Sequence, residues 1–184
     1  AVELCSLHMA YGWHPEQVVA NALFADGAAA VVASVNPSPT HQTLALRRSG
    51  SMVIPNSSDL MHWEIGDHGF AMGLSPLVPE TVGAALLPWL RDWLKDQSID
   101  LEAVASWAVH PGGPRILSTC AEVLSLGPDH LRESRGILQD HGNMSSATIL
   151  FILDRLRRRS TPGPCLALAF GPGLSAEVAL FDFQ

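Results

Sequence analysis

The chain has few charged residues and no long apolar run, and each shortage excludes a class of protein. Charged residues make up 16% of its 184 residues, against a usual share of about 25%, whereas hydrophobic residues make up 47%. This balance argues against a disordered chain and against a coiled coil. No apolar stretch reaches the ~18 residues of a membrane span, and no basic and then apolar leader opens the chain. The length fits one folded domain, residues 1–184.

Cysteine and positive charge are also scarce. Cys5, Cys120 and Cys165 form no CxxC pair and their number is odd, so we expect no disulfide framework, no metal site and a reducing, cytoplasmic setting. The 11 Lys and Arg against 18 Asp and Glu give a net charge of -7. That charge provides no general attraction for nucleic acid or for a membrane surface.

Hydrophobic periodicity predicts alternating strands and helices. Apolar residues three and four apart predict a helix over Pro79–Lys95. Apolar runs predict buried strands at Val2–Met9 and Ala28–Val35. The alternation favours an α/β fold with helices packed over a mixed sheet. The other predicted elements are helices at Pro15–Leu23, Pro114–Leu124 and Met144–Arg158, one or two strands within Leu44–Ile54, a hairpin or bulged strand over Trp63–Leu74, and strands at Val104–Val109, Leu166–Phe170 and Glu177–Phe183.

Three short segments combine a polar residue with glycines just after a predicted strand or at the start of a predicted helix, where α/β proteins often bind ligands. His110 follows one strand and can act as a general acid or base, or as a neutral N–H donor. Asn143 precedes a helix and can cap it or direct its amide at a ligand. The third segment, residues 171–173, is by itself typical of a turn between two strands. Taken singly, each segment is also consistent with a structural role.

Five motifs occur in an order that identifies a family. The chain resembles the chalcone synthase-like type III polyketide synthases, most closely their bacterial members, and the likeness extends over essentially the whole chain. The motifs that carry it are Val2–His8 (VELCSLH), Asn21–Ala29 (NALFADGAA), Trp107–Pro114 (WAVHPGGP), His141–Ala147 (HGNMSSA) and Phe170–Leu174 (FGPGL).

This resemblance implies the C-terminal half of a thiolase-like fold, in which two similar halves are related by a pseudo-dyad. The family extends acyl-CoA starters with malonyl-CoA, using a catalytic cysteine, histidine and asparagine. On this likeness His110 matches the histidine and Asn143 the asparagine. Two fixed N–H donors would stabilise the enolate oxygen that malonyl decarboxylation creates. CoA thioesters are the implied substrates, and no further cofactor is implied.

The family's nucleophilic cysteine lies upstream of the segment that Val2–His8 matches. Cys5 matches a non-nucleophilic cysteine of the family, and its apolar surroundings predict an inert thiol. The chain starts at Ala1 directly before an apolar segment, so we expect a cut or excised chain that lacks an N-terminal half. We therefore expect little or no activity from this chain alone.

The resemblance also implies substrate-binding positions. Phe24 matches a gatekeeping aromatic residue, and Trp63 and Met72 match the wall that limits product length. A bulky Trp63 predicts a short polyketide. The remaining implied positions on the CoA and active-site surface are Gly112, Gly113, Ser145, Gly171, Pro172 and Gly173.

Two alternatives stay open at this point. The chain could be a non-catalytic domain that associates with itself through an apolar face that the absent half would cover. It could also be a condensing domain of the ketoacyl synthase III type, with an acyl carrier protein as partner. Because soluble proteins rarely leave large apolar faces exposed, we expect a homodimer built on the face that the absent half would cover.

Overall fold

The computed structural model describes residues 1–36, 42–67, 69–161 and 163–184. The helices of this part are α1 (Pro15–Leu23), α2 (Val78–Lys95), α3 (Pro114–Val123), α4 (Arg132–His141) and α5 (Thr148–Arg158). Its strands are β1 (Val2–Glu3), β2 (Gly27–Ala28), β3 (Leu44–Val53), β4 (Met61–Gly66), β5 (Gly69–Leu74), β6 (Ser106–Val109), β7 (Cys165–Gly171) and β8 (Ser175–Phe183).

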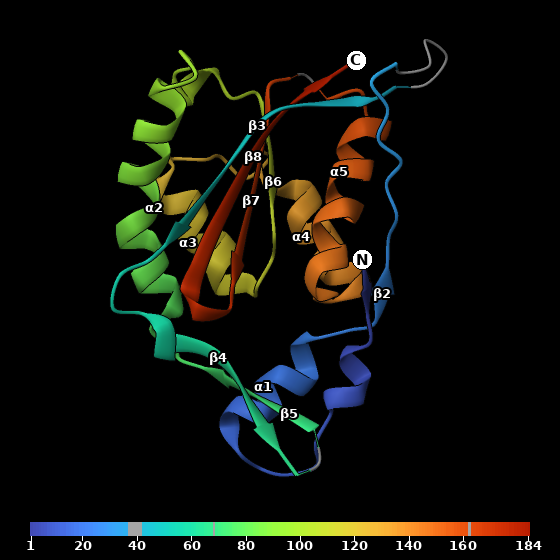
Figure 1. Ribbon diagram of the computed structural model, residues 1–184, viewed down its shortest axis with the longest axis vertical. Coiled ribbons are helices and arrows are strands. Elements are labelled where there is room, and N and C mark those ends of the chain that lie inside the picture. Colours follow the sequence, from blue (N-terminus) through green and yellow to red (C-terminus); the bar gives the residue numbers. More distant parts are fainter. Residues whose placement is uncertain (37–41, 68, 162) are drawn as a thin grey trace.

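Four strands form the central sheet, in the order β3, β8, β7, β6. Strand β8 runs antiparallel to both of its neighbours, whereas β6 and β7 are parallel. Because β6 and β7 are parallel, their carboxyl ends lie at the same end of the sheet (Figure 1). The segments that follow Val109 and Phe170 therefore start close together.

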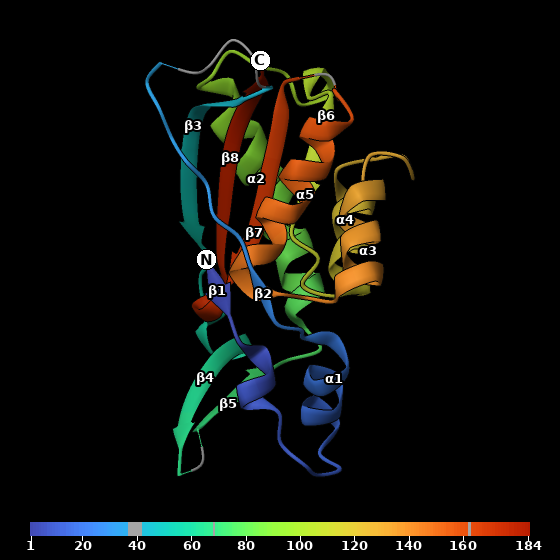
Figure 2. The ribbon, with the colours of Figure 1, turned by 90° about the vertical axis from the view of Figure 1, so that its right-hand side faces the viewer.

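Alternation along the strands divides the core into two layers. Large side chains such as Trp107, Leu168 and Leu180 pack with α2 and α3 on one face of the sheet. Small side chains such as Ala108 and Ala167 pack with α5 on the other face. Figure 1 shows the sheet between α2 and α5, and in Figure 2 α3 and α4 lie on the side of the sheet away from β3. The expected α/β fold with a mixed sheet covered by helices is confirmed.

The strongest periodic signals correspond to regular elements. Helix α2 begins one residue before the predicted range and buries Val82, Leu86 and Leu90 along one side. Helix α1 has the predicted bounds. The predicted hairpin is β4 paired with β5, and the region predicted as one or two strands from Leu44 is the single strand β3. The strands and helices predicted after residue 100 are confirmed to within a few residues, apart from the start of α5.

Two predictions in the N-terminal region are wrong. The segment Val2–Met9 is not a buried strand: β1 covers two residues and Cys5–His8 forms a 3₁₀ turn. The strand predicted over Ala28–Val35 ends at Ala28, and Val32 is 96% exposed. Both segments are apolar enough for burial, but no strand in the described part of the chain pairs with them beyond two residue pairs. A strand needs a neighbour, and the apolar pattern alone does not provide one.

The region around Asn143 also differs from the prediction. The chain enters α5 through a 3₁₀ turn, so the helix starts at Thr148 and not at Met144. Thr148 accepts a hydrogen bond from the Met144 N–H through its Oγ1 atom at 2.8 Å. Helix α4 has no counterpart among the predicted elements, because it is polar over much of its surface and contains Gly136.

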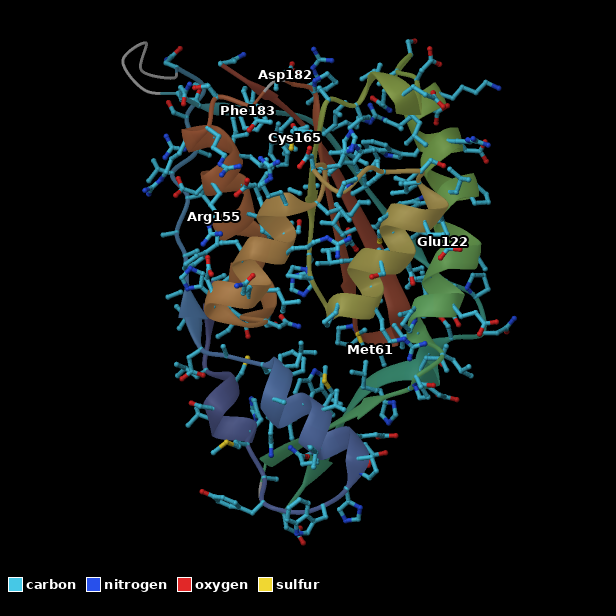
Figure 3. All side chains as sticks on the ribbon, turned by 180° about the vertical axis from the view of Figure 1, so that it is seen from behind. Met61, Glu122, Arg155, Cys165, Asp182 and Phe183 are labelled. Atoms are coloured by element: carbon cyan, nitrogen blue, oxygen red, sulfur yellow. The ribbon has the colours of Figure 1, made fainter. Side chains whose placement is uncertain are left out.

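A smaller layer covers the lower end of the sheet in both ribbon views. It consists of α1, the Cys5–His8 turn and the β4–β5 hairpin (Figures 1 and 2). Met61, at the start of this hairpin, lies at the junction between the layer and the sheet (Figure 3). This layer faces the carboxyl ends of β6 and β7, which is where the candidate site is located.

Candidate active site

His110 is held at the end of β6 by its main chain. Its N–H donates to the Leu168 carbonyl at 2.7 Å, and its own carbonyl accepts from the Gly112 N–H at 3.0 Å. The Val109 N–H donates to Ser134 Oγ at 3.1 Å. With only 9% of the residue exposed, the imidazole lies in a protein environment and not in solvent.

Burial lowers the pKa of His110 from its ordinary value to about 4. Burial is the only cause of this shift, so no described carboxylate counteracts it. The imidazole is therefore uncharged at neutral pH and carries one N–H. A neutral imidazole can donate a hydrogen bond to a developing anion, whereas an imidazolium would also be a ready source of a proton.

Asn143 is fixed by main-chain bonds to the last residue of α1 and to the segment that follows it. Its N–H donates to the Leu23 carbonyl at 2.9 Å, and its carbonyl accepts from the Ala25 N–H at 2.9 Å. Gly142 before it has a φ of +75°, and a Cβ there would lie 3.2 Å from the Leu23 carbonyl oxygen. Only glycine fits this close approach without strain.

The Asn143 side chain does not cap a helix, because α5 starts at Thr148 and the 3₁₀ turn before it starts after Met144. Its Oδ1 instead accepts a hydrogen bond from the Ser145 N–H at 2.9 Å and closes a turn two residues on. That bond fixes the orientation of the carboxamide and leaves its Nδ2 as the donor group. The residue is 2% exposed, yet it lines a cavity.

His110 and Asn143 line the same cavity of about 720 Å³. This volume is in the usual range for small-molecule sites. Of the sequence-derived binding positions, the cavity is lined by Phe24, Trp63, Met72, Gly112, Ser145 and Pro172. It is not lined by Gly113, Gly171 or Gly173. A Cβ at Gly171 would lie 3.1 Å from Ser175 Oγ, and one at Gly113 would lie 3.7 Å from Leu23 Cδ2.

The far wall of the cavity is aromatic. His8 stacks at a tilt against Trp63 with ring centroids 5.4 Å apart, and its ring edge meets Phe70 at 5.7 Å. Trp63 and Phe70 form an edge-to-face pair at 6.4 Å. Neither His8 nor Phe70 was among the residues predicted for the site. His8 reaches the β4–β5 hairpin only because Cys5–His8 forms a turn and not the predicted strand.

None of the three cysteines is suited to nucleophilic attack. Burial raises the pKa of Cys120 to about 12 and the pKa of Cys165 to about 11. Cys165 begins β7 and lies far from Met61 (Figure 3), at the opposite end of the sheet from the cavity. Cys5 lines the cavity, but burial and then the nearby carboxylates of Glu3 and Asp26 raise its pKa. All three thiols are protonated at neutral pH, so the expectation of inert cysteines agrees with their surroundings.

Among the described residues there is neither a metal site nor a membrane-spanning helix. No three His, Cys, Asp or Glu side chains among them group as metal ligands. No helix in the described ranges has the length and apolarity needed to cross a membrane.

Residues 45–182 match the family of chalcone and stilbene synthases, C-terminal domain. The chain belongs to this family. It is 34% identical over 185 residues to 1,3,6,8-tetrahydroxynaphthalene synthase of Streptomyces peucetius subsp. caesius, covering 98% of the chain and 49% of that protein. It is 30% identical over 186 residues to "Probable polyketide synthase 1" of Dictyostelium discoideum, covering 95% of the chain and 6% of that protein.

Solved structures of type III polyketide synthases share the fold of this family member. PKS-I from the brown alga Ectocarpus siliculosus superposes with a TM-score of 0.87 at 26% identity, covering 100% of the chain and 51% of that structure. The C-terminal type III domain of Steely1, a type I/III hybrid from Dictyostelium, gives 0.85 at 28% identity, covering 99% of the chain and 52% of that structure. The chain thus spans about half the length of each of these structures, as expected for the C-terminal half of a thiolase-like fold.

The burial of His110 predicts a pH dependence of stability. Its pKa is about 4 in the folded chain and ordinarily 6.5, so the unfolded chain binds an extra proton between these values. The free energy of unfolding therefore falls as the pH drops from 7 to 4, by about 2–3 kcal/mol from this group. Denaturant unfolding of the wild type and of His110→Gln at several pH values measures this contribution.

His110→Gln is expected to lose that part of the pH dependence. His130, which is exposed on the connection between α3 and α4, provides the control, and His130→Gln should keep the full wild-type slope. Equal slopes for the wild type and His110→Gln would show that His110 is not held uncharged.

Proposed function

We propose that the chain is the C-terminal half of a type III polyketide synthase and supplies two hydrogen-bond donors for the decarboxylative condensation of malonyl-CoA with an acyl-CoA starter. The observation that carries this proposal is the placement of a neutral imidazole and an oriented carboxamide on one cavity. Family membership supports the reaction class.

The chemistry requires donors at one oxygen. When the malonyl thioester loses CO₂, the electron pair of the broken C–C bond moves into the thioester and forms an enolate. Its oxygen becomes negative and accepts hydrogen bonds from His110 and the Asn143 Nδ2. The enolate carbon then attacks the starter carbonyl, a C–C bond forms, and a thiolate leaves. Because His110 is neutral, it stabilises the enolate without readily protonating its carbon.

The attacking thiol comes from elsewhere in this proposal. With all three cysteines protonated at neutral pH, the chain has no thiolate to load with an acyl group. An N-terminal half of the family would supply the nucleophile. Its docking surface would be the apolar N-terminal region, where Leu7, Trp13 and Val32 are 72%, 95% and 96% exposed. The same region is the candidate face for a homodimer.

The substrates in this proposal are acyl-CoA and malonyl-CoA, and the setting is cytoplasmic. The net charge of -7 gives the chain no surplus of cations for the CoA phosphates. Most contacts with those phosphates are therefore assigned to the other half. This chain would contribute the inner cavity, where carbon–carbon bond formation takes place.

The two donors are tested in the assembled enzyme, that is, this chain together with an N-terminal half of the family that carries the nucleophilic cysteine. His110→Ala and Asn143→Ala should each lower the rate of CO₂ release from malonyl-CoA by ~10²–10³, because one preorganised donor to an oxyanion typically contributes that much. His130→Ala is the control and should keep the wild-type rate.

Unchanged CO₂ release in both variants would contradict the proposal. Mass spectrometry of the isolated chain after incubation with acyl-CoA should show no covalent adduct, whereas the assembled enzyme should show one on the N-terminal half. If the chain only associates with itself, adding an N-terminal half restores no turnover.

The aromatic wall predicts product length. Trp63→Gly removes the largest side chain of this wall, so the assembled enzyme should release longer polyketides, measured as product masses by chromatography and mass spectrometry. Ile65→Gly is the matched control: it lies on the same strand, is 86% exposed and does not line the cavity. An unchanged product distribution in Trp63→Gly would show that this wall does not limit chain extension.

A further inference from the structure

The main-chain donor next to His110 is satisfied by a side chain and not by a strand. Strand β6 is the outer strand on its side of the sheet. The His110 N–H points to β7 and bonds the Leu168 carbonyl, so the Val109 N–H points away from the sheet. Ser134 Oγ on α4 accepts this N–H at 3.1 Å. Both Val109 and Ser134 are fully buried, so water cannot replace the serine.

Helix α4 also leads directly to the second donor. It ends at His141, and the Gly142 N–H bonds the Leu138 carbonyl at 3.0 Å, after which the chain continues into Asn143. Helix α4 is therefore connected to both donors. Its Ser134 bonds the main chain of Val109, next to His110, and the chain runs from its last residue, His141, into Asn143. The separation of the two donors depends on where α4 lies.

Two ion pairs join that helix to α5 and to the residue that follows α5. Arg155 pairs with Asp140 at 2.7 Å near the carboxyl end of α4, and Arg159 pairs with the buried Glu133 beside Ser134. Figure 3 shows Arg155 on α5. Ser134 thus belongs to a helix that is held at both ends.

We propose that Ser134 is a positioning residue that holds the His110 imidazole at its working distance from Asn143. This inference rests on the proposed function, since it assigns Ser134 a part in the same oxyanion site. Ser134 touches no substrate, because it is fully buried and does not line the cavity. Its effect is indirect: without the acceptor, the buried Val109 N–H has no partner, and the end of β6 shifts to find one. Small displacements of a reacting group can lower rates by up to about 10².

The kinetic test compares Ser134→Ala with two other variants in the assembled enzyme. Ser134→Ala should lower kcat for malonyl-CoA decarboxylation by about 10 to 100-fold and leave KM within about threefold, since the substrate surface is intact. Ser134→Thr keeps a hydroxyl acceptor and should restore most of kcat. Ser57→Ala is the matched control, because Ser57 is also a buried serine that bonds a main-chain atom, the Ile54 carbonyl at 2.7 Å, outside the cavity lining.

A second readout needs no activity. The ring signals of His110 in NMR spectra of this chain should shift in Ser134→Ala and stay at their wild-type positions in Ser57→Ala. If Ser134→Ala does not fold, Ser134→Cys, which keeps a weaker acceptor at the same position, takes its place in both measurements.

The two readouts separate the possible failures. A wild-type assembled enzyme without CO₂ release would overturn the proposed function. In that case the positioning role would still be supported if the ring signals of His110 shift in the Ser134 variant and not in Ser57→Ala. Unshifted ring signals, or a loss of kcat no greater than in Ser57→Ala, would overturn the positioning role.

Discussion

The candidate site depends on one buried, uncharged histidine, His110, at the end of the outer strand β6. His110 gains no carboxylate partner that would stabilise a positive charge, and burial alone lowers its pKa to about 4. An outer strand is a difficult place for such burial, because one row of its main-chain groups has no neighbouring strand. Helix α4 covers that row and provides Ser134 as acceptor. The surroundings of His110 thus depend on the packing of a helix that does not itself line the cavity.

The other elements of the fold also determine where His110 and Asn143 lie. Parallel pairing of β6 with β7 brings the segments after Val109 and Phe170 to one end of the sheet. Small residues on the second face, Ala108 and Ala167 among them, let α5 lie close to the strands. Arg155 of α5 and Arg159 directly after it form ion pairs with α4. The smaller layer of α1, the Cys5–His8 turn and the β4–β5 hairpin lines the cavity on the other side, and the end of α1 fixes Asn143 through main-chain bonds.

Hydrophobic periodicity in the sequence predicted the helices and strands that depend mainly on the pattern of their own residues. The spacing of Leu86 and Leu90 defines the buried side of α2, and the same reasoning gives the strands after residue 100. The error at Ala28–Val35 has a different origin: apolarity indicates a demand for burial, but a strand forms only beside a partner. Helix α4 was missed because much of its surface is polar. That His110 and Asn143 share a cavity follows from tertiary packing; the family resemblance indicated it, whereas their spacing of 33 positions could not. Tertiary packing also explains two errors about the cavity lining. His8 lines the cavity although the sequence did not indicate it, and Gly113 does not line the cavity although the family resemblance implied it.

The most direct test is a crystal structure of the assembled enzyme with a malonyl-CoA analogue that cannot lose CO₂. The account predicts that the thioester oxygen lies about 3 Å from a ring nitrogen of His110 and about 3 Å from Nδ2 of Asn143. A thioester oxygen that contacts neither donor, or a His110 ring turned away from the ligand and paired with a protein group, would contradict it.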